Sequence, residues 1–63
     1  MRGFRIGDII RVKGGRYSDR YGQIDRIDDG EALVMIRGKH SLDVEELENL
    51  DLVWPAEEIY VGN

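Results

Sequence analysis

The residues best suited to bind a ligand lie in the segment RYSDRY, residues 16–21, where two arginines alternate with two tyrosines. Guanidinium groups contact phosphates and aromatic rings stack on nucleobases, so this composition is typical of a nucleic-acid contact on a loop. A second interpretation stays open, in which Tyr17 packs into the core and the other side chains are ordinary solvated residues. On the first interpretation, the contact residues are Arg16, Tyr17, Arg20 and Tyr21.

The chain offers no comparable set of residues for catalysis or metal binding. His40 is the only histidine and the sequence has no cysteine, so a metal would lack its usual protein ligands. Residues 38–41 are similar to the end of a phosphate-binding loop, but Leu33 stands where that motif needs its first glycine. A nucleophile, a base and an orienting group cannot be assembled around one histidine. We therefore expect a protein that is not an enzyme and that uses no cofactor and no metal.

Charge is unevenly distributed along the chain. Residues 1–40 contain all nine Lys and Arg against six acids, whereas residues 41–63 contain seven acids and neither Lys nor Arg. The net charges of the two parts are +3 and −7, and a local field steers ligands even when the total charge, −4, has the opposite sign. We expect nearby basic residues to contribute to binding by the candidate segment: Arg11, Lys13, Arg26, Arg37 and Lys39.

The candidate segment is expected to connect two strands. Ile10 and Val12 alternate with charged residues, which is the period-two pattern of a half-buried strand, and Asp8 marks the turn before it. Gly14–Gly15 then ends this strand, because glycine adopts positive φ without penalty. Gly22 begins a second extended run.

The second strand is expected to bend before it turns back. Ile24 and Ile27 are three residues apart, so one face can bury both only if a bulge or bend lies near Asp25–Arg26. The sequence DDGE at residues 28–31 predicts a tight type I′ hairpin. The run ALVMI at residues 32–36 predicts a third strand, which is either the most buried one or covered by a partner on one face.

The last third of the chain allows two interpretations at its start. Residues 42–49 form either a helical turn with Ser41 as N-cap or an acidic insertion in a loop. Alternation over residues 50–54 predicts a fourth strand, and PAEE at residues 55–58 suits one helical turn with proline at its first position. A short last strand is expected over residues 59–61.

Two aromatic residues are expected at the margins of the core. Phe4 precedes the first strand and is expected to close one end of the core. Trp54 lies between the fourth strand and a proline, and it either caps the core, which we prefer, or stands exposed as a binding platform.

The spacing over residues 7–28 resembles the KOW motif. Its pattern is a glycine–acid pair, alternating apolar residues, a loop glycine, and a glycine followed two places on by an aliphatic residue. The matching positions are Gly7, Asp8, Ile10, Val12, Gly15, Gly22 and Ile24. The closest likeness is to the C-terminal domain of the NusG transcription factors, with ribosomal KOW proteins next.

The resemblance implies a single domain over residues 1–63 with an all-β fold. That fold is a small five-stranded antiparallel SH3-like barrel with a short helical turn before the last strand. Against the NusG pattern, Arg16 stands where proline is common and Arg20 where an aromatic is common, and the segment at residues 42–49 is extra. Ribosomal KOW proteins are also strongly basic, whereas this chain is not.

The leading functional prediction is a non-catalytic binding module of transcription or translation. It would contact RNA or a nucleoprotein component through residues 16–21. The N-terminal sequence lacks the apolar region of a signal peptide, and no apolar run approaches the roughly 20 residues that span a bilayer. We therefore expect a cytoplasmic protein without membrane insertion.

A second hypothesis is an acidic adaptor, or an accessory subunit of a photosynthetic or respiratory complex, that docks a basic protein partner. Its contact residues would be Glu45, Glu46, Glu48, Asp51 and Trp54. A third is a mimic of phosphates, whose carboxylates occupy a basic nucleic-acid site on a partner.

Overall fold

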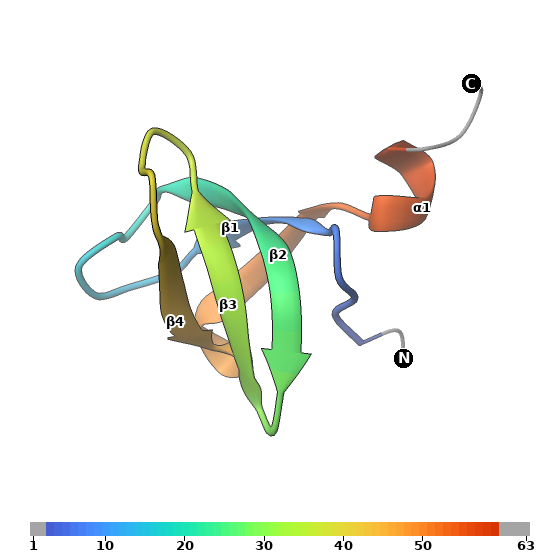
Figure 1. Cartoon of the computed structure of the whole chain (residues 1–63), viewed down its shortest axis with the longest axis horizontal. Helices are drawn as coiled ribbons and strands as arrows, with labels where there is room; N and C mark the ends of the chain where they lie inside the picture. Colours follow the sequence, from blue (N-terminus) through green and yellow to red (C-terminus); the bar gives the residue numbers. More distant parts are fainter. Residues whose placement is uncertain (1–2, 60–63) are drawn as a thin grey trace.

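The alternating apolar residues of the chain form one antiparallel sheet, with the strand order β4-β3-β2-β1-β5 in the computed structural model (Figure 1). The structure describes residues 3–59. Its elements are β1 (Ile9–Val12), β2 (Tyr21–Asp28), β3 (Glu31–Ile36), β4 (Leu42–Glu46), the 3₁₀ helix η1 (Leu47–Asn49), β5 (Leu50–Trp54) and α1 (Ala56–Ile59). The predicted class, a small five-stranded antiparallel SH3-like fold, is confirmed.

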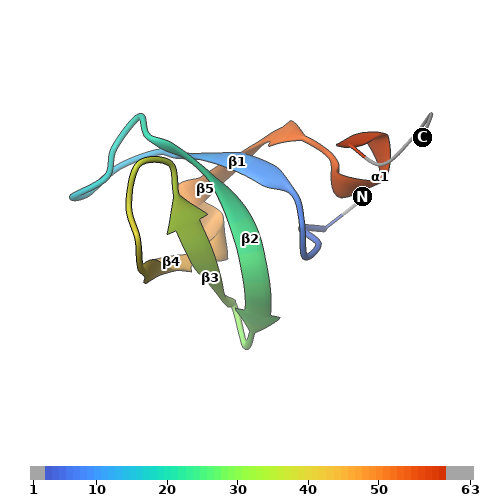
Figure 2. The ribbon, with the colours of Figure 1, turned by 45° about the horizontal axis from the view of Figure 1, so that its top comes forward.

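Strand β2 bends sharply and so belongs to both halves of the sheet. Its first residues pair with β1, and the strand then curves down along β3 (Figure 2). The pairing with β3 shifts register between Ile24 and Arg26, which confirms the bulge predicted there. This irregularity lets Ile24 be fully buried while Ile27 also packs against the core.

The turn between β2 and β3 is the predicted two-residue hairpin. Asp28 pairs with Glu31, and the two residues between them, Asp29 and Gly30, have φ values of 47° and 81°. Positive φ at both positions defines the type I′ turn, whose twist matches that of the flanking strands.

One face of the sheet supplies the core. The buried cluster consists of Ile10, Val12, Ile24, Ala32, Val34, Ile36 and Leu50. Phe4 packs against this cluster, as predicted. The preferred interpretation of Trp54 is wrong, because its side chain is 53% exposed. Strand β3 buries alternate residues only, and Met35 on its other face is 41% exposed.

Residues 47–49 form a helical turn, η1, with Glu46 rather than Ser41 as its N-cap, whereas residues 42–46 form a strand, contrary to both interpretations. The strand sequence LDVEE alternates apolar and acidic residues, and β4 pairs with β3 so that Leu42 lies opposite Met35 and Val44 opposite Leu33. Opposite residues share a face in antiparallel pairs, so all four line the outer side of the sheet. The expected last strand falls mostly outside the described residues, and its first residue, Ile59, ends α1 instead.

A buried carboxylate ties the start of the chain to its end. Asp8 is fully buried, and its Oδ2 accepts a hydrogen bond from the Arg5 backbone N–H at 2.8 Å. Its Oδ1 accepts one from the Ala56 backbone N–H, also at 2.8 Å, at the first residue of α1. The turn expected at Asp8 is therefore also an anchor for α1. Between residues 3 and 59, neither helix has the length and apolar character needed to cross a membrane.

Candidate nucleic-acid interface

Two loops that are distant in sequence lie together at one end of the sheet (Figures 1 and 2). The Arg20 guanidinium donates a hydrogen bond to the carbonyl oxygen of Arg37, with an Nη2–O distance of 2.9 Å. The ammonium group of Lys39 lies 5.3 Å from the centroid of the Tyr17 ring. We call the surface of these two loops, residues 13–20 and 37–41, the basic end.

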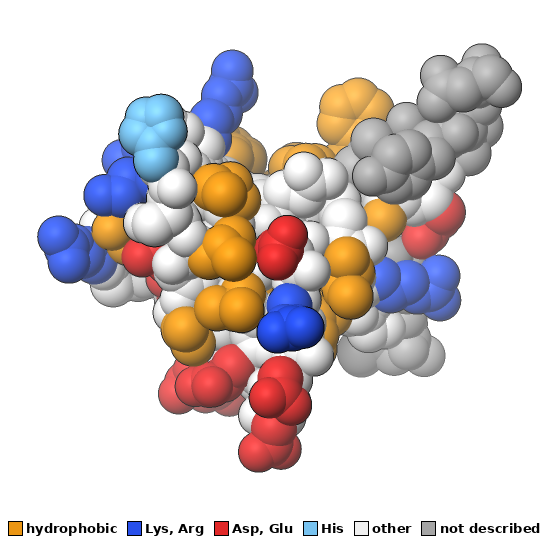
Figure 3. Space-filling view, in the orientation of Figure 1, with side chains coloured by type: hydrophobic (Ala, Val, Ile, Leu, Met, Phe, Trp, Pro, Cys, Tyr) orange, Lys and Arg blue, Asp and Glu red, His pale blue; other side chains and the backbone are white. Residues whose placement is uncertain are grey.

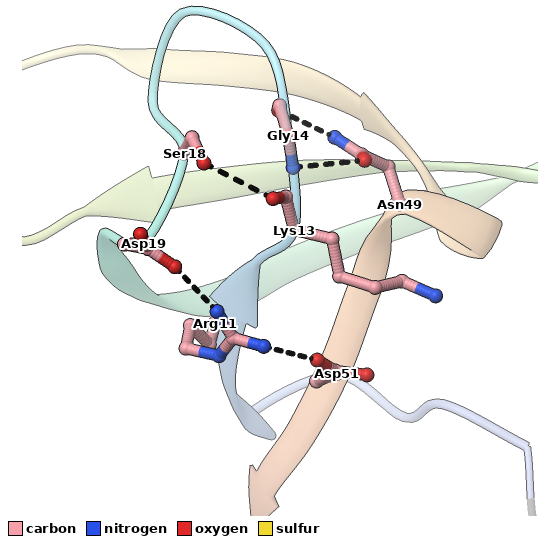
Figure 4. A network of polar contacts seen from close by, with 7 residues as sticks. All are labelled: Arg11, Lys13, Gly14, Ser18, Asp19, Asn49 and Asp51. Carbon is pink, nitrogen blue, oxygen red and sulfur yellow. Dashed lines mark hydrogen bonds and ion pairs between the residues drawn. The ribbon is translucent and has the colours of Figure 1, made fainter.

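The first of these loops is held in one shape by polar contacts (Figure 4). The Ser18 hydroxyl donates to the Lys13 carbonyl at 3.0 Å. The Asn49 side chain accepts from the Gly14 N–H at 3.1 Å and donates to the Gly14 carbonyl at 2.9 Å. Asn49 belongs to η1, so the loop is fixed to a segment far along the chain. Sequence reasoning missed Asn49, because nothing in its local pattern points to residue 14.

The basic end carries an excess of positive charge. It contains five Lys and Arg and a single acid, Asp19, whose carboxylate forms an ion pair with Arg11 at 2.6 Å. Within the part of the chain that the structure describes, none of the five cations lies within ion-pair distance of a carboxylate. These cations are Lys13, Arg16, Arg20, Arg37 and Lys39.

Two of these cations lie against the ring of Tyr17. Tyr17 is partly buried and packs against the core, as the second interpretation of the loop expected. The guanidinium carbon of Arg16 lies 5.6 Å from its ring centroid, and the Lys39 ammonium lies at a similar distance. Both contacts are within cation–π range. Tyr21 differs, because its side chain is 46% exposed at the start of β2.

Two predicted basic residues do not belong to this group of unpaired cations. Arg11 forms ion pairs of 2.6 Å with Asp19 and with Asp51, one through each terminal nitrogen (Figure 4). Its charge is therefore already neutralised. Arg26 lies opposite Leu33 on the outer side of the sheet, where it borders the acids of the hairpin. The Lys13 side chain in Figure 4 points away from the Arg11 ion pairs.

The acids gather around the hairpin and the end of β4. Glu31 lies directly opposite Glu46, and these residues line a hollow with Asp29 and Glu48. Figure 3 shows this division: acidic side chains lie at the bottom of the view and most basic ones at the left and top. We call the surface formed by Asp28, Asp29, Glu31, Glu46 and Glu48 the acidic surface.

The five residues predicted for an adaptor are only partly brought together. Glu46 and Glu48 belong to the acidic surface, and Glu45 lies beside it, where its Oε1 accepts a hydrogen bond from Asn49 at 3.0 Å. Asp51 is held in its ion pair with Arg11, and Trp54 lies opposite Ile9 on β1. The last two residues are therefore not part of the acidic surface.

The fold defines a class of small SH3-like domain, and this chain carries a cluster of cations at one end of the sheet. The family model of the KOW motif matches residues 6–40, which is more than half of the sequence. The chain therefore belongs to the KOW-motif family. The match includes β1, β2, β3 and nearly all of the basic end. A comparison with curated proteins finds no match to this sequence. KOW motifs are non-catalytic binding motifs, typical of RNA-binding, ribosomal and transcription-factor proteins.

Proposed function

We propose that this chain is a non-catalytic module that binds RNA, or a nucleoprotein component of the transcription or translation machinery, through the basic end. The observation that supports this most is the group of cations without carboxylate partners among the described residues. All five come from the two loops of the basic end, and four of them take part in the contacts that involve Tyr17 or join the loops: Arg16, Arg20, Arg37 and Lys39. A phosphate backbone supplies the anions that the protein itself does not.

The rigidity of the loops strengthens this proposal. The Arg16 and Lys39 cations both lie against the Tyr17 ring, and neither has a carboxylate within ion-pair distance among the described residues. A phosphate that binds these cations releases its own counterions, which is the main source of affinity for nucleic acids. Because hydrogen bonds already fix the loop, little conformational entropy is lost on binding.

Within the family, this proposal places the chain nearer to the NusG C-terminal domain than to ribosomal KOW proteins. The spacing of the glycines and aliphatic residues over residues 7–28 supports this, and so does the net charge of −4. A negative total weakens long-range attraction to RNA. We infer that such a module acts in the cytoplasm, with the acidic surface limiting non-specific binding.

The proposal is tested by measuring the salt dependence of RNA binding. Fluorescence anisotropy with a labelled single-stranded RNA compares the wild type with the double variant Arg16→Gln/Arg20→Gln. Removal of two phosphate contacts should lower the slope of log K against log salt by about 1.4. Arg26→Gln is the matched control, because Arg26 is an exposed arginine outside the basic end. Equal slopes for all three proteins would contradict the proposal.

A second candidate function is an adaptor that binds a basic protein, and one observation favours it. Met35, Leu42 and Val44 are exposed on the outer side of the sheet. Figure 3 shows apolar side chains gathered over β3 and β4, directly above acidic ones. An apolar patch with an acidic rim suits a partner with apolar and basic residues, such as a subunit of a larger complex. Pull-down with and without nuclease separates this function from RNA-mediated capture.

A further inference from the structure

A hollow of about 410 Å³ lies on the outer side of the sheet, next to the basic end. Three strands contribute to it, together with the first residue after β3. Its volume falls within the range of about 300–1,000 Å³ that is typical of small-molecule sites. The lining residues are Ile9, Tyr21, Gly22, Gln23, Met35 and Arg37.

The side chains that line this hollow are suited to contact the flat face of a nucleobase. Tyr21 and Met35 are 46% and 41% exposed, so a ring and a polarisable thioether are both available to a planar ligand. The Arg37 guanidinium, which has neither a hydrogen-bond nor an ion-pair partner among residues 3–59, adds a second planar group. Guanidinium and aromatic planes are the groups on which proteins stack unpaired bases.

Gln23 adds a polar group of fixed orientation. Its Nε2 donates a hydrogen bond to the Gly7 carbonyl at 3.0 Å. A carbonyl oxygen can only accept, so the amide nitrogen must face Gly7. The Oε1 atom is then left to accept a hydrogen bond from a base, which carries donors on its edge.

The hollow is also joined to the cations of the basic end. Arg37 belongs to both, and its backbone N–H donates to the Tyr21 carbonyl at 2.8 Å. Its own carbonyl accepts the hydrogen bond from Arg20. A phosphate held by Arg20 and Arg37 would therefore carry its base beside the hollow. In a duplex the bases are paired and stacked, and none is free to enter.

We propose that this hollow binds one unpaired base of a single-stranded RNA whose phosphates contact the basic end. This inference rests on the proposed function and adds that single-stranded RNA is preferred to a duplex. The duplex would make phosphate contacts alone.

The test compares one RNA as a single strand and as a blunt duplex, by anisotropy, with wild-type protein and Tyr21→Ala. The substitution should weaken single-strand binding by roughly 5- to 150-fold, because one stacked base is lost. Duplex binding and the salt slope should be unchanged, and Tyr21→Phe should retain wild-type affinity because it keeps the ring. Leu42→Ala is the matched control, since Leu42 is similarly exposed on the same face but does not line the hollow.

A second measurement needs no substitution at Tyr21. In an NMR spectrum of protein labelled with ¹³C-methyl methionine, the two labelled residues are Met1 and Met35. The variant Met35→Leu lacks one of the two signals and so assigns both. A base in the hollow should shift the Met35 methyl resonance upfield through its ring current, and the duplex should not.

The outcomes separate this inference from the proposed function. Equal loss of single-strand and duplex affinity in Tyr21→Ala, or no shift at Met35, overturns the inference even if RNA still binds with a normal salt slope. RNA binding that is absent, or insensitive to Arg16 and Arg20, overturns the proposed function itself. Loss of a nuclease-resistant protein partner in Tyr21→Ala, with RNA binding unchanged, assigns the hollow to a protein side chain and also overturns the inference.

Discussion

The Nη2 atom of Arg20 donates a hydrogen bond to the carbonyl oxygen of Arg37 at 2.9 Å, and this contact joins the two loops of the basic end. The two residues are seventeen positions apart. Arg37 is the first residue after β3. The hydrogen bond therefore fixes the loop before β2 relative to the end of β3. Arg20 therefore contributes both a charge and a structural link.

Substitutions at Arg20 should separate these two roles. Arg20→Lys keeps the charge, but lysine lacks the planar fork of donors that reaches Arg37. We expect Arg20→Lys to retain the wild-type salt slope while lowering RNA affinity through a less ordered loop. Arg20→Gln should lower the slope by about 0.7, the value for one phosphate contact on a single strand. If Arg20→Lys lowers the slope as much as Arg20→Gln, the guanidinium itself makes the phosphate contact.

Gly22 should be intolerant of any side chain. A Cβ atom there would lie 2.7 Å from the Met35 carbonyl oxygen and 2.7 Å from Cγ1 of Val34, in the pairing of β2 with β3. The Met35 oxygen belongs to backbone and cannot move without disturbing that pairing. Gly22→Val should lower the free energy of unfolding by on the order of 2–4 kcal/mol, as measured by thermal or urea denaturation.

The matched control for this substitution is Gly3→Val. No heavy atom lies within 4 Å of a Cβ at Gly3. We expect its melting temperature to stay close to that of the wild type. A Gly22 variant that melts at the same temperature as the Gly3 variant would show that the strand pairing tolerates the extra atoms.

Asp8 should contribute to stability through its buried hydrogen bonds. Asp8→Ala removes the acceptor for the backbone N–H groups of Arg5 and Ala56. Buried donors without partners are costly, so the free energy of unfolding should fall by roughly 2–4 kcal/mol. Asp8→Asn keeps one acceptor oxygen and should cost about half as much. Asp25→Ala, at an exposed position of β2, should change stability little. Equal stability of the Asp8 and Asp25 variants would exclude this anchoring role.

Local patterns were enough to predict most of the sheet. The three-residue spacing of Ile24 and Ile27 requires a bulge on physical grounds, and the structure has one there. The hairpin at residues 28–31 follows from the positive φ that a type I′ turn needs. These features depend on residues close together in sequence, so periodicity and turn chemistry are sufficient.

The features that were missed depend on contacts between distant residues. Residues 42–46 form a strand because Leu42 and Val44 pair opposite Met35 and Leu33, while acids occupy the alternate positions. Five residues rich in acid carry too weak a pattern to indicate this alone. Pairings such as Asn49 with Gly14, or Asp8 with Ala56, exist only after the sheet has folded. The composition of the basic end could be read from the sequence, but the convergence of its two loops could not.

The acids at the end of β4 and in η1 distinguish the two proposed functions, through the triple variant Glu45→Gln/Glu46→Gln/Glu48→Gln. If the chain binds RNA, these acids repel phosphates, and their removal should strengthen RNA binding, most visibly at low salt where the Debye length exceeds its physiological value of about 8 Å. If the acids dock a basic protein, the same variant should lose that partner and associate with it more slowly. Stability should hardly change, because glutamine at position 45 still offers an oxygen to Asn49.

The control for this variant removes three charges elsewhere, as Asp25→Asn/Glu57→Gln/Glu58→Gln. These residues lie outside both the acidic surface and the basic end. If only the total charge matters, both triple variants should change RNA affinity equally. If the local field matters, the variant whose acids lie nearer to the bound phosphates should change it more. Anisotropy at two salt concentrations measures RNA affinity, and a nuclease-treated pull-down of the same proteins measures binding of a protein partner. Tighter RNA binding in the first variant alone, with the protein partner retained, supports RNA as the ligand of the basic end. Loss of the partner, with RNA binding absent throughout, supports the adaptor.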